Sequence, residues 1–168
     1  LEAAIWDLLA QSEGLPLADY LRAGQNYSQP RRDRVNVGVS VGIQSSVEET
    51  VSTVAGYIEQ GYRRIKLKIE PGWDVDVARA VRREFPDIPL MLDANSAYSL
   101  KDAERLKQLD EFNLLMIEQP LAYDDIYEHA KLQAQLSTPI CLDESIHTLK
   151  HAEWAYELEA CRIINIKP

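Results

Sequence analysis

Charged residues recur at regular intervals at the ends of short apolar runs in this chain. Successive members are separated by 25, 25, 25 and 24 residues, and the members are Lys68, Asp93, Glu118, Asp143 and Lys167. Because an even strand–helix repeat puts equivalent positions at the same level of neighbouring strands, we expect all five at one rim of a sheet. Amines and carboxylates gathered at one rim indicate acid–base chemistry.

Three of these residues are carboxylates that would converge from consecutive strands: Asp93, Glu118 and Asp143. Neighbouring negative charges repel one another and raise their own pKa values unless a cation is present. Oxygen ligands without histidine or cysteine favour magnesium over zinc, with manganese as the second candidate. A single acid of this kind could equally cap the following helix, but three in phase favour a metal site.

Lys66 and Lys68 are two residues apart in the run Arg64–Ile69, so they share one face of the expected strand. Each ammonium would disfavour protonation of the other, which lowers one or both pKa values toward those of a usable base. Lys167 would approach from a strand across the barrel. A ligand held on the metal would then have an amine on each side.

This combination suits the removal of a proton from the carbon next to a carboxylate in a small-molecule substrate. Such a proton is weakly acidic, and a metal on the carboxylate oxygens would stabilise the enediolate that forms. One lysine would take the proton, while the lysine on the opposite face would donate a proton or stabilise the anion. Elimination and racemisation both fit this arrangement.

A repeated strand–helix pattern must position these residues. Six short apolar runs are expected to be strands: Val35–Val41, Arg64–Ile69, Ile88–Leu92, Leu114–Ile117, Pro139–Leu142 and Arg162–Ile166. Five segments with helical spacing separate them, which predicts parallel strands covered by helices. An open doubly wound sheet and a closed (β/α) barrel both satisfy this pattern. No glycine-rich phosphate-binding sequence follows the first strand, and the charged rim favours the barrel.

The beginning of the chain departs from this repeat. Leu1, Ile5, Leu8 and Leu9 form one helical stripe, and the segment Gln25–Arg34 is polar. We therefore expect residues 1–34 to be a helix and a linker, with the helix packed against the barrel base or against a neighbouring domain. Residues 35–168 would be the catalytic barrel domain.

Composition excludes several classes of function. The net charge is −9 and no basic run occurs, which argues against a nucleic-acid partner, and no apolar run reaches the roughly 18 residues of a membrane span. Cys141 and Cys161 lack the spacing of a zinc site or a disulfide framework, so free thiols in a cytoplasmic protein are expected. His129, His147 and His151 are expected at the surface or at helix caps.

The motifs around the charged residues resemble those of the enolase superfamily, in its muconate-lactonising-enzyme branch. The matching segments are Lys66–Lys68, Asp93–Asn95, Ile117–Pro120, Leu142–Ser145 and Ile166–Pro168. Longer stretches, including PLMLDANSAY and PICLDES, are similar to the group of o-succinylbenzoate synthases and N-succinylamino acid racemases. A lysine or histidine base used together with magnesium is known chemistry of this superfamily.

The resemblance implies a role for each site residue. The magnesium ligands would be Asp93, Glu118 and Asp143. Asn95 and Glu144 would contact those ligands without binding the metal themselves. Lys68 would abstract the α-proton, and Lys66 would assist it electrostatically. Lys167 would stabilise the enediolate in a syn-dehydration that forms 2-succinylbenzoate for menaquinone biosynthesis, or act as the opposite-face acid and base in racemisation.

The resemblance also implies what surrounds these residues. Residues 1–34 would be the last helix and linker of an N-terminal capping domain. Residues 35–168 would hold about six of the eight units of the barrel, so that the chain resembles a fragment of an intact protein, itself a candidate homo-oligomer. Three functions stay open: o-succinylbenzoate synthase, N-succinylamino acid racemase or dipeptide epimerase on the same site, and an inactive barrel fragment.

Overall fold

The computed structural model of the chain describes residues 1–23, 32 and 34–167. These residues fall into two compact units. The N-terminal unit comprises the described residues of 1–35 together with Ile166 and Lys167, and the sheet unit runs from Asn36 to Asn165.

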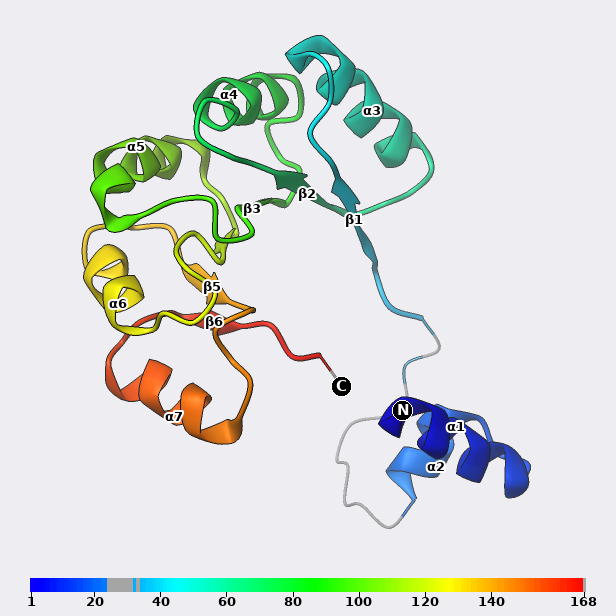
Figure 1. Cartoon of the computed structure of the whole chain (residues 1–168). Coiled ribbons are helices and arrows are strands. Elements are labelled where there is room, and N and C mark those ends of the chain that lie inside the picture. Colours follow the sequence, from blue (N-terminus) through cyan, green and yellow to red (C-terminus); the bar gives the residue numbers. More distant parts are fainter. Residues whose placement is uncertain (24–31, 33, 168) are drawn as a thin grey trace. The chain divides into compact units, whose positions relative to one another are not determined.

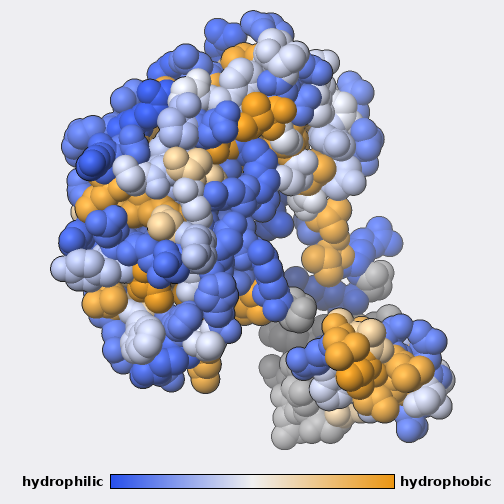
Figure 2. Space-filling view, in the orientation of Figure 1, coloured by the Kyte–Doolittle hydropathy of each residue, from blue (hydrophilic) through white to orange (hydrophobic). Residues whose placement is uncertain are grey.

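The N-terminal unit contains two helices, α1 (Glu2–Ser12) and α2 (Leu17–Arg22). The first confirms the helix expected from the apolar stripe, and the second was not predicted. Gly14 separates them in a left-handed conformation (φ +66°), which a glycine adopts without strain. Ile5 and Leu8 of the stripe are exposed, and Figure 2 shows an apolar patch on the surface of this unit. The expected linker lies mostly outside the described residues.

The sheet unit is built on six parallel strands in sequential order, β1 to β6. Their bounds are β1 Gly38–Val41, β2 Arg64–Lys68, β3 Leu90–Asp93, β4 Ile117–Glu118, β5 Ile140–Leu142 and β6 Ile163–Ile164. All six predicted strands are present, and each is shorter than the apolar run from which it was predicted. Sequential parallel order is the arrangement of a (β/α) barrel, so the predicted six of eight units are confirmed.

Helices connect these strands and follow one another along the outer side of the sheet (Figure 1). They are α3 Val47–Glu59, α4 Val75–Glu84, α5 Ala103–Lys107, α6 Tyr127–Gln133 and α7 Leu149–Glu157, with the 3-10 turns Leu100–Asp102 and Gln108–Phe112 on either side of α5. Side-chain caps begin three of them. The hydroxyl oxygen of Ser46 accepts from the N–H of Glu49, Asp74 caps α4, and Thr148 caps α7.

The core lies between the strands and these helices. Alternation along β2 buries Ile65 and Leu67 completely against the helices, while Lys66 and Lys68 project to the other face, as predicted. Burying each such aliphatic side chain stabilises the fold by roughly 1.5–3 kcal/mol. The core therefore anchors the strands, and the strands position the charged residues on their inner face. Within the described residues, no helix has the length and apolar character that crossing a membrane requires.

Candidate active site

Lys68, Asp93 and Glu118 stand side by side at the carboxyl ends of three adjacent strands. Lys68 is the direct register partner of Asp93, and Asp93 is the direct partner of Glu118. The two carboxylates are only 2% exposed. The predicted convergence at one level is therefore found for these three residues.

The other two members of the series lie beyond the ends of β5 and β6. Glu118 is opposite Cys141, so Asp143 lies two residues beyond that level, and Lys167 lies four residues beyond Ile163, the partner of Cys141. The expectation of one common register was wrong for both residues. A closed barrel of eight strands with a shear of eight staggers by one residue per strand on average. The total offset of four over the four steps from β2 to β6 equals that average, although all of it falls in the last two steps. Because an offset of two preserves the strand face, Asp143 stays on the face of Glu118.

Lys167 belongs to the N-terminal unit, and its side chain is exposed and has an interaction partner. Its place opposite Lys68 stays a prediction.

Two ammonium groups neutralise the pair of carboxylates. The Nζ atom of Lys66 lies 2.9 Å from Oδ2 of Asp93 and 3.1 Å from Oε2 of Glu118. Lys68 Nζ lies 2.7 Å from the same Oδ2 of Asp93 and also donates to Oδ1 of Asn95. Lys66 thus bridges two strands, and Lys68 connects Asp93 to the loop that follows it.

These contacts set the protonation of the cluster. Burial alone would raise the pKa of Asp93, but hydrogen bonds and charges from Lys68 and Lys66 outweigh burial and hold that pKa below its usual value. Burial alone would lower the pKa of Lys66, but Asp93 and Glu118 outweigh it and raise that pKa. The expected lowering was therefore wrong for Lys66, because its carboxylate neighbours outweigh any repulsion between the two lysines.

Amide side chains complete the hydrogen bonding of this cluster. Asn165 donates from Nδ2 to Oε1 of Glu118 at 3.0 Å, and Asn95 donates from Nδ2 to Oε1 of Glu144 at 3.0 Å. The second oxygen of Glu144 is buried and has no hydrogen-bond partner among the described residues. Asn95 and Glu144 thus lie behind Lys68 as a linked pair. The sequence analysis missed Asn165, although alternation from Lys167 two residues later would have placed it on the same face.

Asp143 is held through its backbone. It is 8% exposed, and its N–H donates to Oε1 of Gln119 at 3.0 Å. Gln119 is completely buried and directly follows Glu118. Sequence reasoning missed Gln119 as well, because a glutamine in a strand-end loop carries no periodic signal.

The donor set fits a hard divalent cation. The buried carboxylates on adjacent strands offer oxygen atoms, as do the neighbouring amides, and hard cations such as magnesium prefer such ligands. In the described part of the chain, no three histidine, cysteine, aspartate or glutamate side chains are arranged as a metal-binding group. Lys66, which bridges Asp93 and Glu118, supplies positive charge between them.

The cysteines and histidines take their own places. Both cysteines are free thiols, and burial raises the pKa of Cys141 to about 12. His129 was expected at the surface or at a helix cap, but its side chain is completely buried. Its Nε2 accepts from the N–H of Leu121 at 3.1 Å, and its Nδ1 lies 2.9 Å from the carboxylate of Asp125. His129 therefore anchors the loop that follows β4.

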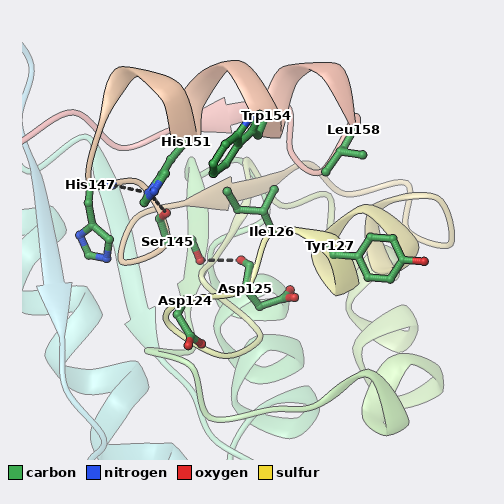
Figure 3. Close-up of a pocket in the computed structure, with 9 residues that line it drawn as sticks. All are labelled: Asp124, Asp125, Ile126, Tyr127, Ser145, His147, His151, Trp154 and Leu158. Atoms are coloured by element: carbon green, nitrogen blue, oxygen red, sulfur yellow. Dashed lines mark hydrogen bonds between the residues drawn. The ribbon is translucent and has the colours of Figure 1, made fainter.

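A separate pocket of about 340 Å³ lies between that loop and α7 (Figure 3). α7 contributes His151 and Trp154 to one wall, Leu158 follows the end of that helix, and residues 124–127 line the facing wall. The ring of His151 stacks on Trp154 with centroids 5.6 Å apart. This pocket is lined by none of the predicted site residues.

The chain is similar to known proteins over most of its length. The family of enolase C-terminal domain-like proteins matches residues 49–168. The chain is 57% identical to an o-succinylbenzoate synthase of Geobacillus kaustophilus over 99% of this chain and 43% of that protein. It is 55% identical to an N-succinylamino acid racemase of Thermus thermophilus over 100% of this chain and 44% of that protein.

A solved structure is similar as well. The dipeptide epimerase of Cytophaga hutchinsonii, in complex with Mg and the dipeptide D-Ala-L-Val, is 26% identical to this chain with a TM-score of 0.82. The match covers 96% of this chain and 43% of the epimerase. The chain thus spans less than half the length of each of these three proteins.

Proposed function

The chain belongs to the enolase C-terminal domain-like family, and on this premise we propose that it supplies the catalytic barrel residues of a magnesium-dependent o-succinylbenzoate synthase. The observation that carries the proposal is the cluster in which Lys68, Asp93 and Glu118 lie in register on adjacent strands. Identity of 57% to a synthase across nearly the whole chain supports this reaction.

Enzymes of the enolase superfamily depend on magnesium in general, and for this chain the magnesium ligands are a proposal. Asp93, Glu118 and Asp143 would hold the ion. When bound, it would supply positive charge to the substrate carboxylate and stabilise the enediolate.

The lysines would do the proton chemistry. Lys68 would take the α-proton, which requires its amine to be neutral and to release its hydrogen bond to Asp93. Lys66, whose pKa is raised, would stay protonated and place a fixed positive charge beside the developing anion. Lys167 would stabilise that anion from the opposite side. Asn95 would orient Lys68 through the hydrogen bond that they share.

Racemisation of N-succinylamino acids is the second candidate function. The 55% identity to a racemase favours it almost as strongly as the synthase, and both reactions begin with the same proton removal. Epimerisation of dipeptides on the same site is a more distant alternative, with 26% identity to a dipeptide epimerase. For the intact protein, an inactive barrel is disfavoured because the three acids and the two lysines of β2 are all present. For these 168 residues alone, an inactive barrel fragment stays an alternative.

The proposal also extends to the organisation of the protein. Residues 1–34 would belong with a capping domain and residues 35–168 with the barrel. The substrate would be a small carboxylate, bound at the rim that Lys68 and Asp93 share.

The test uses the protein that the natural gene encodes. We expect it to form 2-succinylbenzoate, measured by ultraviolet absorbance, and to lose activity in EDTA and regain it with magnesium. Two measurements on N-succinylamino acids test the racemase reaction in parallel. Incorporation of deuterium at the α-carbon measures proton exchange, and polarimetry measures the loss of optical rotation. Absence of both reactions and of deuterium exchange would contradict the proposed chemistry.

A further inference from the structure

Gln119 occupies a strained and completely buried position next to a proposed magnesium ligand. It directly follows Glu118, and its backbone is in the left-handed region (φ +38°), which is unfavourable for a residue with a side chain. Such a conformation persists only where the surroundings hold it in place. The hydrogen bonds of Gln119 show what does so.

The acceptor half of the Gln119 amide faces the end of β5. Its Oε1 accepts from the N–H of Asp143 at 3.0 Å and from the N–H of Ser145 at 3.3 Å. The two bonds fix the main chain on both sides of Glu144. The position of the Asp143 backbone therefore depends on the Gln119 side chain.

The donor half of the same amide faces the loop after β4 and the hydroxyl of Ser145. Its Nε2 donates to Oγ of Ser145 at 2.6 Å and to the carbonyl of Ala122 at 3.0 Å. Oγ of Ser145 donates in turn to the carbonyl of Asp125 at 2.7 Å, a bond drawn in Figure 3. One amide thus joins the loop after β4 to the loop after β5.

The backbone of Gln119 forms hydrogen bonds with β5 and with the segment that follows β3. Its N–H donates to the carbonyl of Cys141 at 2.8 Å, and its carbonyl accepts from the N–H of Ser96 at 2.8 Å. Ser96 lies three residues after Asp93. Gln119 therefore contacts the strand ends that carry all three proposed magnesium ligands.

From this geometry we propose that Gln119 is a positioning residue that sets the place of Asp143 relative to Glu118, and thereby the affinity of the site for a divalent cation. The inference rests on the magnesium role proposed above. Because Asp143 lies two residues beyond the level of Glu118, the stagger of the barrel alone does not fix how their carboxylates meet. The amide bridge supplies that link, and partners of this kind affect metal affinity without touching the metal.

A second buried glutamine provides a matched control at the opposite end of the same strand. Gln133 accepts from the N–H of Ile140, the first residue of β5, at 2.7 Å and donates to the carbonyl of Thr138 at 3.2 Å. Gln119 and Gln133 thus make the same kinds of bond to the two ends of β5. Only Gln119 lies at the end that carries the proposed ligands.

The experiment compares Gln119→Met with Gln133→Met in the full chain. Thermal unfolding in EDTA measures stability, and titration with Mn²⁺, followed by calorimetry and electron paramagnetic resonance, measures binding. We expect both variants to unfold at lower temperature. We expect Gln119→Met alone to bind Mn²⁺ more weakly, by about tenfold or more, with an altered resonance spectrum.

Each outcome decides the matter. Equal Mn²⁺ affinity in the Gln119 variant and the unaltered chain overturns the positioning role and leaves the magnesium site standing. Absence of Mn²⁺ binding by the unaltered chain overturns both. If Gln119→Met does not fold, Ser145→Ala removes the 2.6 Å bond from Nε2 of Gln119 together with the 2.7 Å bond to the carbonyl of Asp125. Weakened binding then supports the role, and unchanged binding overturns it.

Discussion

Lys68 and Asp93 lie directly opposite each other on neighbouring parallel strands, and the Nζ atom of Lys68 is 2.7 Å from Oδ2 of Asp93. The proposed base therefore shares a carboxylate oxygen with the proposed metal site. A proton on Lys68 and a cation on Asp93 would compete for the same negative charge. On the proposed roles, this competition would link metal binding to release of the lysine for proton transfer.

Replacing Lys68 tests its role as the base. In the protein that the natural gene encodes, Lys68→Met should reduce α-deuterium exchange by about 10²–10⁴-fold, the range that a positioned general base contributes. Nuclear magnetic resonance in D₂O measures the exchange. Lys150→Met, at an exposed lysine that pairs with Glu153 and lies over the ring of Trp154, is the control and should leave the rate unchanged. Retention of the wild-type exchange rate in the Lys68 variant would refute its assignment.

Removing Lys66 tests whether its ammonium neutralises the carboxylates. Lys66→Met leaves Glu118 without its bridge to Asp93. Because Lys66 is only partly exposed, the free energy of unfolding, measured without metal, should fall by about 1–3 kcal/mol. Magnesium should then raise the melting temperature of the variant more than that of the unaltered chain. Calorimetry with and without magnesium measures both effects. If magnesium raises the melting temperature equally in the two proteins, Lys66 and the cation do not neutralise the same carboxylates.

An ion pair away from the site, between the buried Asp74 and the exposed Arg105, predicts how stability depends on pH. Burial alone would raise the pKa of Asp74, but Arg105, the N–H of Val75 and the hydroxyl of Tyr98 outweigh it and lower that pKa. A depressed pKa stabilises the fold above the unfolded value of about 3.9, and this contribution is lost as pH falls through the folded value. Asp74→Asn should therefore be less stable by about 1–3 kcal/mol at pH 7.

The difference between the unaltered chain and Asp74→Asn should shrink below about pH 4. Urea unfolding at several pH values measures it. Asp76→Asn is the control, since its carboxylate is exposed and pairs with Arg79 within one turn. A gap between Asp74→Asn and the unaltered chain that stays constant down to acid pH would contradict the lowered pKa.

The buried thiol of Cys141 predicts chemical inertness. With a pKa of about 12, this group is almost wholly protonated at pH 8, and the thiolate is the reactive form. Iodoacetamide should therefore modify Cys141 only in denatured protein, with Cys161, which is less buried, as the internal comparison. Mass spectrometry of the digested protein reports both sites. Rapid modification of Cys141 in the folded chain would show that it is not enclosed.

Much of the fold follows from local patterns. Alternation in residues 64–68 predicted which side chains of β2 face the site, and the even spacing of charged residues located the strand ends. The offset of Asp143 could not be seen in this spacing, because barrel stagger arises from the packing of strands and not from chain distance. The helix α2 was not predicted for a different reason. Its six residues are too few to show a helical repeat of apolar positions.

The supporting residues were harder to predict. Asn165 and Gln119 act through bonds to residues 47 and 24 positions away, and no local spacing encodes such partners. A surface or helix-cap position was predicted for His129 because it lies near a helix with no pattern of partners around it. Its burial depends on the loop after β4 folding back, so that the N–H of Leu121 and the carboxylate of Asp125 reach the ring.

The position of the cation is the most direct test of the site. Crystals of the protein that the natural gene encodes, grown with Mn²⁺, would reveal the ion by its anomalous scattering. We predict one peak within about 2.0–2.3 Å of carboxylate oxygens from Asp93, Glu118 and Asp143 together. A peak bound elsewhere, or those three carboxylates pointing apart with no cation among them, would contradict the proposed active site.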